Sequence, residues 1–279
     1  MSRLGKLFEP GRPLIMGILN ATPDSFSDGG LFVDPAAALE HARHMVEEGA
    51  DIIDVGGEST RPGSDPVAAE DQILRVVPVI AALRASLPKG LLISIDTTRA
   101  GVAEAALEAG ADFINDISAG RDDPAILALA ARRGAPIVLM HMQGSPKTMQ
   151  DAPVYGSVVD EVLAFLLERA AAARAAGVPS EHILLDPGIG FGKRREDNLT
   201  LLAHLSRFVA TGYSVLLGTS RKRFMGAVCH ETDPQRLVGA TVATTALGAA
   251  AGVRLFRVHD VRENRQAAEV VHAIRQIGV

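Results

Sequence analysis

The sequence of 279 residues contains no tryptophan, two tyrosines and a single cysteine, Cys229. A lone cysteine excludes an internal disulfide, a CxxC redox pair and a cysteine-based metal cluster, and it suits a reducing compartment. The shortage of large aromatic side chains argues against a stacking platform for nucleic acid. The formal net charge of −5 argues equally against a protein that binds a phosphate backbone. We therefore predict a cytoplasmic protein with no nucleic-acid partner.

Long hydrophobic runs are also missing. Residues 1–13 lack the apolar segment of a signal peptide. The longest uncharged stretch, residues 237–253, is short for a membrane span and rich in Ala, Gly and Thr. We interpret it as a helix packed within a globular protein, and we predict no membrane partner.

One pattern recurs eight times along the chain: a short apolar run ends in polar or glycine residues, and an alanine-rich amphipathic stretch follows. The runs are continuous rather than alternating, which is typical of parallel strands covered on both faces. The predicted strands are 14–19, 51–55, 91–95, 112–114, 136–140, 182–185, 214–217 and 253–258. The predicted helices are 35–48, 69–87, 99–109, 124–133, 157–176, 196–204, 234–251 and 261–277.

Eight strand–helix units in a chain of this length predict a single (β/α)₈ TIM barrel of the α/β class, with the active site at the carboxyl ends of the strands. An open doubly wound sheet is the alternative. A dinucleotide-binding sheet of that kind carries GxGxxG after its first strand, whereas here Asn20 and Ala21 follow it. No linker divides the chain, so we predict one domain over residues 1–279, with 1–13 as a cap on the barrel floor.

The residues that follow the strands of a barrel converge on one face. Their acidic and amide members are Asp96, Asn115 and Asp186, and their basic members are Arg61, Lys222, Arg257 and His259. Recessed carboxylates and amides suit a flat heterocycle with several N–H donors, whereas cations beside glycine-rich loops suit phosphoryl groups. The pattern predicts a substrate with a polar ring at one end and a phosphoryl group at the other.

Single polar residues after strands also have a purely structural interpretation, because Asp, Asn and Thr commonly cap helices or form turns. We favour that interpretation for Thr98, Asp116 and Asp260. The neighbouring cations Arg221, Lys222 and Arg223 are different, since positive charge at a helix start opposes the helix dipole. An anionic ligand would explain all three placements together.

The motifs at the strand ends closely resemble the dihydropteroate synthase family, the folate-pathway targets of sulfonamides. The matching segments occur in family order and cover nearly the whole chain. They are MGILNATPDSFSDGG at 16–30, DVGGESTRPG at 54–63, SIDT at 94–97, INDI at 114–117, MHMQG at 140–144, DPGIGFGK at 186–193, SRK at 220–222 and RVHD at 257–260.

The resemblance implies a homodimeric barrel that uses Mg²⁺. It would condense 6-hydroxymethyl-7,8-dihydropterin pyrophosphate with 4-aminobenzoate to give 7,8-dihydropteroate and pyrophosphate. The implied pterin ligands are Asp96, Asn115, Met140, Asp186 and Lys222. The implied pyrophosphate ligands are Asn20, Thr60, Arg61, Arg257 and His259, with Asn20 also binding the metal. The implied aminobenzoate pocket comprises Pro62, Phe191, Ser220 and Arg223. The implied catalytic residues are Asp96, Lys222 and Arg257.

Two positions depart from the family pattern. Ile189 stands where a second phenylalanine is common, and Arg223 stands where a serine often contacts the aminobenzoate carboxylate. A guanidinium pairs with a carboxylate more strongly than a hydroxyl does, but it is bulkier. We further expect loops 21–31 and 59–66, which carry Gly, Ser and Pro, to act as lids that order over the ligands.

Three rival functions fit part of the pattern. A methyltetrahydrofolate–corrinoid methyltransferase would share the pterin ligands but needs no pyrophosphate clamp. A metal-dependent hydrolase could use His141, Asp186 and His259, although the first strand lacks an HxH pair. A non-enzymatic ligand-binding protein would bind the pterin pyrophosphate without turnover.

Overall fold

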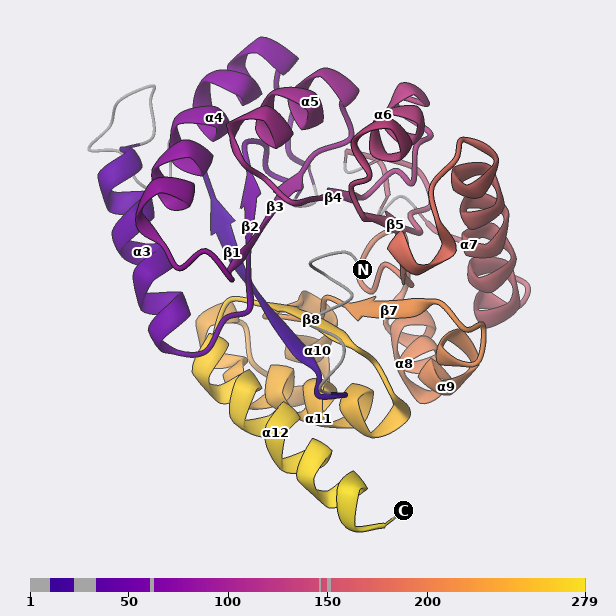
Figure 1. The fold of residues 1–279 in the computed structure, drawn as a ribbon. Coiled ribbons are helices and arrows are strands. Elements are labelled where there is room, and N and C mark those ends of the chain that lie inside the picture. Colours follow the sequence, from indigo (N-terminus) through magenta and orange to yellow (C-terminus); the bar gives the residue numbers. More distant parts are fainter. Residues whose placement is uncertain (1–10, 23–33, 61–62, 146, 150–151, 279) are drawn as a thin grey trace.

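The structure is a computed structural model that describes residues 11–22, 34–60, 63–145, 147–149 and 152–278. Eight parallel strands pair in sequence order, and the last pairs with the first to close a barrel. The helices form a ring outside the strands (Figure 1). The predicted (β/α)₈ barrel is confirmed, and the open doubly wound sheet is excluded by the closing pair.

The strands are β1 (Leu14–Asn20), β2 (Ile52–Gly56), β3 (Leu92–Asp96), β4 (Phe113–Asp116), β5 (Ile137–Met140), β6 (Ile183–Asp186), β7 (Ser214–Leu217) and β8 (Leu255–Val258). The α-helices are α3 (Pro35–Glu47), α4 (Ala69–Ser86), α5 (Ala100–Ala109), α6 (Ala125–Arg133), α7 (Val158–Ala175), α8 (Arg195–Ala203), α9 (Leu205–Val209), α10 (Arg223–Cys229), α11 (Val238–Ala251) and α12 (Val261–Ile277). Two 3₁₀ turns are η1 (Ser180–His182) and η2 (Pro234–Arg236).

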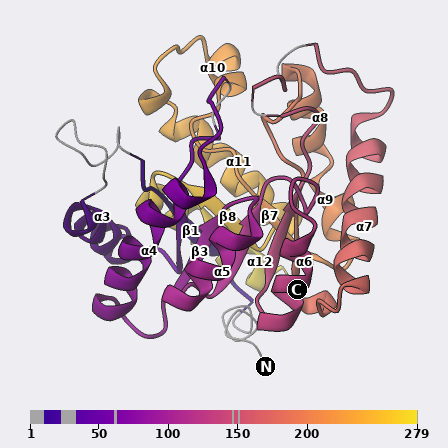
Figure 2. The same cartoon turned by 90° about the horizontal axis from the view of Figure 1, so that it is seen from above.

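Two of the predicted helices differ from the observed ones. The helix expected over 234–251 is divided, because Leu237 leaves helical geometry between η2 and α11. The helix expected over 196–204 begins at Arg195, ends before His204, and is followed by α9. The short helix α10 lies above the barrel at the carboxyl ends of the strands (Figure 2).

Local signals in the sequence place several helix ends. The Asp34 side chain accepts a hydrogen bond of 2.9 Å from the Ala36 amide, with Pro35 in the first turn of α3. Gly110 and Gly134 end α5 and α6 in left-handed conformations, which glycine adopts without steric cost. These caps turn each helix back toward the next strand.

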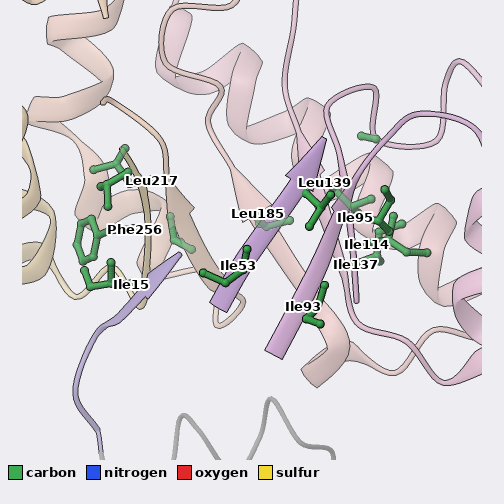
Figure 3. Close-up of a cluster of buried hydrophobic side chains, with 14 of the residues drawn as sticks. Ile15, Ile53, Ile93, Ile95, Ile114, Ile137, Leu139, Leu185, Leu217 and Phe256 are labelled. Atoms are coloured by element: carbon green, nitrogen blue, oxygen red, sulfur yellow. The ribbon is translucent and has the colours of Figure 1, made fainter. Parts of the chain in front are cut away.

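Two apolar layers hold the barrel together. The larger layer lies between the strands and the helices, and it includes Ile15, Ile53, Ile93, Leu185 and Phe256 (Figure 3). The smaller one consists of Leu14, Met16, Ile52, Leu92, Phe113, Val138, Leu184, Leu216 and Leu255. Because neighbouring side chains on a strand point to opposite faces, the second layer is the one that fills the barrel interior.

The interior changes from apolar to polar along the strand direction. Two residues after Ile52, Leu92 and Leu255 come Asp54, Ser94 and Arg257, which point the same way because the side-chain period of a strand is two. Asn115 and Asp186 follow Phe113 and Leu184 in the same manner. The apolar interior layer therefore supports a layer of charged and amide groups at the carboxyl ends.

Some predicted features fall wholly or partly outside the described residues. These are most of the predicted cap at 1–13, most of the predicted lid at 21–31, and Arg61 and Pro62 within the second predicted lid. Among the described residues, no helix has the length and apolar content needed to cross a membrane.

Replacing Phe113 with alanine tests the interior layer, because the side chain is fully buried among the apolar residues of the barrel. The variant should lose about 3–5 kcal/mol of unfolding free energy. Leu74→Ala on α4 is the control, since Leu74 is 59% exposed, and it should change stability by less than about 0.5 kcal/mol. Urea unfolding measures both. Equal losses would contradict a packed barrel interior.

Candidate active site

An ion-pair network crosses the mouth of the barrel from β8 to β2, β3 and β4. Arg257 Nε lies 2.6 Å from Asp54 Oδ2, and Arg257 Nη2 lies 2.8 Å from Asp96 Oδ2. Asn115 Nδ2 donates to the same Asp54 oxygen over 3.1 Å. Three of the predicted site residues, Asp96, Asn115 and Arg257, are thereby brought together.

Asp54 was not among the predicted site residues, although its side chain is completely buried beside Arg257. The signal that could have found it is its position two residues after Ile52, which gives it the same inward direction. Asp54 Oδ1 and Ser94 Oγ, in register on β2 and β3, are buried with no hydrogen-bond partner among the described residues. Polar atoms of this kind at the base of a site are uncommon in folded proteins and mark a surface suited to a polar ligand.

Burial and the ion pairs of this network shift the pKa values of Asp96 and Arg257. Burial raises the pKa of Asp96 to about 7; the nearby Asp54 carboxylate adds to the rise, and Arg257 opposes it. Burial lowers the pKa of Arg257, but Asp54 and Asp96 raise it more, so it lies above its ordinary value. Arg257 therefore stays charged, while Asp96 changes protonation near neutral pH.

The second group of predicted residues, Asp186 and Lys222, is held by the loop after β6. Asp186 Oδ1 accepts a hydrogen bond of 2.7 Å from the Gly188 amide. The Lys222 ammonium donates to the Ile189 carbonyl and lies 4.5 Å from the centre of the Phe191 ring. Burial raises the pKa of Asp186 although Lys222 opposes the rise, and burial lowers the pKa of Lys222 to about 8.

Met140 and Phe191 belong to a small apolar cluster beside this loop, together with Ile117, Met142 and Met149. Met140 at the end of β5 is 3% exposed, and it lies in register with Asp186. Phe191 packs against the cluster from the loop after β6. An apolar floor next to Asp186 and Lys222 is the surface that a flat ring requires.

The three consecutive cations that follow β7 separate in the structure. Arg221 adopts a left-handed conformation with φ +57° and pairs with Asp260, with Nε 3.0 Å from Oδ2. Lys222 contacts the loop after β6, and Arg223 is exposed at the start of α10. Asp260 stands at the N-cap position of α12 but its side chain makes no cap hydrogen bond; its structural role is the ion pair with Arg221 rather than the predicted cap. Of the three cations, it is Lys222 that lies over the Phe191 ring.

Ser220 and His259 form a pair of their own. Ser220 Oγ lies 2.9 Å from His259 Nδ1 and accepts the His259 backbone amide over 3.1 Å. The two residues follow β7 and β8, which are neighbours in the barrel. A ligand that contacts either residue therefore meets both.

The remaining predicted contacts are Asn20 and Thr60. Asn20 ends β1, in register with Gly56, and its half-buried side chain makes no hydrogen bond to another described residue. An amide oxygen is a hard ligand of the type that Mg²⁺ takes from proteins, usually one or two at a time beside substrate phosphates and water. Asn20 therefore fits a partial magnesium site that a substrate would complete. Thr60 is half-buried at the end of the first described part of its loop.

A metal-dependent hydrolase would need a metal centre built from His141, Asp186 and His259, and the structure does not bring these residues together as one. His141 Nδ1 lies 2.9 Å from Lys193 Nζ, and burial beside this cation lowers the pKa of His141 to about 2. His259 Nδ1 contacts Ser220. No group of three or more His, Cys, Asp or Glu is arranged to hold a metal ion within the part of the chain that the structure describes.

A closed (β/α)₈ barrel with carboxylates, an amide and cations at its strand ends defines the class of barrel enzymes with a ligand site at that face. Comparison with known proteins then identifies the family. The family profile described as "Pterin binding enzyme" matches residues 16–259. The chain belongs to the pterin-binding enzymes and, among them, to the dihydropteroate synthases.

The relatives match over almost their full length. The chain is 48% identical to dihydropteroate synthase of Synechocystis over 269 residues, with 96% of this chain and 92% of the relative covered. It is 44% identical to the Escherichia coli enzyme over 274 residues, with 96% of each covered.

Solved structures agree. Yersinia pestis dihydropteroate synthase with a sulfonamide complex has a TM-score of 0.89 and 43% identity, covering 95% of each chain. The Xanthomonas albilineans enzyme, solved in complex with 7,8-dihydropteroate, has a TM-score of 0.84 and 43% identity, covering 95% of this chain and 94% of that one. These relatives favour the synthase over the corrinoid methyltransferase.

Gly188→Ala tests whether the loop after β6 needs its close approach to β5. A Cβ at Gly188, where φ is +65°, would lie 1.9 Å from the His141 carbonyl oxygen. Gly212→Ala is the matched control, because φ there is +84° and nothing lies within 4 Å. Both variants carry the left-handed cost of about 1–2 kcal/mol, but Gly188→Ala should lose clearly more stability in urea unfolding. Equal losses would show that the loop accommodates the extra carbon.

Proposed function

We propose that the chain condenses 6-hydroxymethyl-7,8-dihydropterin pyrophosphate with 4-aminobenzoate, releasing pyrophosphate and 7,8-dihydropteroate. The observation that carries the proposal is that two differently charged groups share one barrel mouth: Asp186 with Lys222, and Arg257 with Asp96. The first suits a ring with N–H donors on one edge and acceptors on the other, and the second suits a reacting centre beside an anionic leaving group. Related enzymes have been solved with 4-aminobenzoic acid and with 7,8-dihydropteroate.

Asp186 and Lys222 would bind opposite edges of the pterin. The Asp186 carboxylate accepts one hydrogen bond from Gly188, and its remaining capacity suits the ring amino group and the adjacent N–H. Lys222 donates to the Ile189 carbonyl, and with pterin bound it would donate to the acceptor edge of the ring. Met140 would contact the ring face, and Asn115 would extend the polar edge from β4.

Arg257 and Asp96 would act at the reacting carbon. Pyrophosphate leaves well only when its developing charge is neutralised, and Arg257, His259, Thr60 and Arg61 are the groups we assign to that task. The hydrogen bonds of Arg257 to carboxylates use Nε and Nη2, which leaves Nη1 to meet the anion. The carbon left behind carries positive charge that the dihydropterin delocalises and that the Asp96 carboxylate would stabilise.

We assign Mg²⁺ as the cofactor, with Asn20 as its ligand from the chain. When bound, the ion would neutralise part of the pyrophosphate charge and orient the leaving group.

The second substrate, 4-aminobenzoate, would meet Phe191, Ser220, Pro62 and Arg223. Its amine is neutral near pH 7 and needs no strong base to attack.

We also propose a homodimer in the cytoplasm. The single cysteine, Cys229, is exposed and forms no disulfide, which suits a reducing compartment. Small-molecule substrates are the partners that the site supports.

The direct test is pyrophosphate release from the pterin pyrophosphate with and without 4-aminobenzoate and Mg²⁺. The proposal expects release that depends on all three components. Asp186→Asn should weaken pterin binding by about 1–3 kcal/mol, because an amide cannot accept both ring hydrogen bonds. Asp160→Asn is the control, since Asp160 on α7 is 60% exposed. Release that is independent of aminobenzoate would overturn the proposed reaction.

The pH dependence of kcat/KM should be bell-shaped. Asp96 must be ionised to stabilise positive charge, and its pKa is raised to about 7, so the rate should rise with pH through that value. Lys222 must be protonated to donate to the ring, and its pKa is lowered to about 8, so the rate should fall above it. Steady-state rates in pyrophosphate release check the profile.

Two variants test the acid rise and the alkaline fall of kcat/KM separately. Lys222→Arg keeps its charge at all accessible pH values and should remove the alkaline fall. Asp96→Asn should lower the rate throughout and remove the acid rise. A flat wild-type profile over about pH 6–9 would contradict both assignments.

A further inference from the structure

Lys193 is a buried lysine to which the proposed reaction assigns no role. It lies near the end of the loop between β6 and α8, two residues before the helix begins, yet it is 3% exposed. Its ammonium lies within hydrogen-bond distance of two carbonyls of its own loop, Gly188 O at 2.9 Å and Phe191 O at 3.0 Å. It also reaches two atoms of His141 after β5, Nδ1 at 2.9 Å and the carbonyl oxygen at 3.3 Å.

Burying this side chain has an energetic cost. Lysine is rarely buried without partners, because the ammonium loses its hydration. Burial lowers the pKa of Lys193 well below its ordinary value, and the Asp186 carboxylate is the main group that opposes the drop. A solvent-exposed lysine at this position would keep its hydration. The buried contacts of Lys193 are therefore expected to stabilise the local structure of the loop.

Other contacts hold the same loop beside Lys193. Tyr155 Oη donates to the Gly192 carbonyl over 2.6 Å, and the Gly190 amide donates to Asn198 Oδ1 over 2.6 Å. At Gly192, where φ is +61°, a Cβ would lie 2.4 Å from the Gln143 carbonyl. The loop after β6 is therefore pressed onto the loop after β5, and Lys193 lies at the centre of the contact.

We propose that Lys193 is a positioning residue for both substrates. By binding Gly188 O and Phe191 O at once, its side chain braces the turn that the Phe191 amide closes with a 3.1 Å hydrogen bond to the Gly188 carbonyl. This turn joins Asp186, the proposed pterin ligand, to Phe191 of the proposed aminobenzoate pocket, so Lys193 helps to hold the spacing of the two binding surfaces. The inference rests on the proposed function for its account of the substrates.

The charge of Lys193 acts on the same carboxylate. Three cations face Asp186: Lys222 before α10, Lys193 before α8, and Arg257 on β8. The charged groups that face Lys193 itself are Asp186, Lys222 and Asp197 of α8. Each cation lowers the pKa of Asp186 and so favours the ionised form that accepts the ring hydrogen bonds. Removing Lys193 should raise the pKa of Asp186, and pterin binding should then be lost at a higher pH on acidification.

The test compares Lys193→Met, which keeps the length of the side chain and removes its donors and charge, with Lys89→Met on the exposed surface. Three readouts are measured on the full chain. Amide hydrogen exchange of residues 141–144 and 188–193 should become about tenfold faster in Lys193→Met alone. KM for each substrate should rise about tenfold, with a smaller change in kcat. The acid midpoint of pterin binding should move to higher pH.

The readouts distinguish the failure of this inference from the failure of the proposed function. Exchange in the two segments does not depend on any reaction, so unchanged exchange in folded Lys193→Met overturns the positioning role even if the wild type proves inactive. Wild-type activity with unchanged KM values and acid midpoint in the variant also overturns it. A wild type that releases no pyrophosphate refutes the proposed function alone.

Lys193→Gln provides the second variant if Lys193→Met does not fold. Glutamine keeps two N–H donors but is shorter and uncharged, so it should support the fold while still shifting the acid midpoint and speeding exchange. A glutamine variant that matches the wild type in both measurements would contradict the proposal.

Discussion

Arg257 extends from β8 across the barrel to carboxylates on β2 and β3, and the amide of Asn115 on β4 joins the same group. Carboxylates buried this deeply are costly unless a cation compensates them. The guanidinium compensates both at once, because it presents donors on a planar frame with fixed spacing. This contact lets the barrel hold a polar layer on top of an apolar one, and the site on either side of Arg257 depends on it. Burial raises the pKa of Asp96 to about 7 even though this contact opposes the rise, while Arg257 remains charged.

Much of this arrangement could be predicted from the sequence, because it depends on local patterns. Continuous apolar runs indicated parallel strands, Asp34-Pro35 indicated the start of α3, and the residues after the strands gave Asp96, Asn115 and Asp186. Asp54 was missed because it lies inside the predicted strand 51–55, whereas Asp96, Asn115 and Asp186 follow the predicted strands although the observed strands include them. The inward direction of Asp54 follows from its position two residues after Ile52 rather than from a place at a predicted strand end. The break at Leu237 between η2 and α11 was not predicted, because the stretch carries no glycine or proline at that position to mark it.

Contacts between loops were the other feature that the sequence could not supply. The glycines of residues 188–192 indicated turns, but not that their carbonyls converge on a buried ammonium or that Gly188 approaches the His141 backbone. Likewise, three consecutive basic residues after β7 have the same chemical character in the sequence. The left-handed conformation of Arg221 and its pairing with Asp260 direct it away from its neighbours, and this leaves Lys222 beside the loop after β6. Such outcomes depend on backbone geometry that several distant elements decide together.

Two cations at the mouth of the barrel already hold acceptors within the protein. Lys222 binds the Ile189 carbonyl, and Arg257 binds two carboxylates. A small inorganic anion that entered the site would have to compete with these internal contacts while offering no ring to fill the apolar floor around Met140. A molecule that carries both a ring and phosphoryl groups can replace them and gain the floor as well. On physical grounds, a ligand that engages Lys222 and Arg257 together offsets the loss of their internal contacts, whereas a small anion does not.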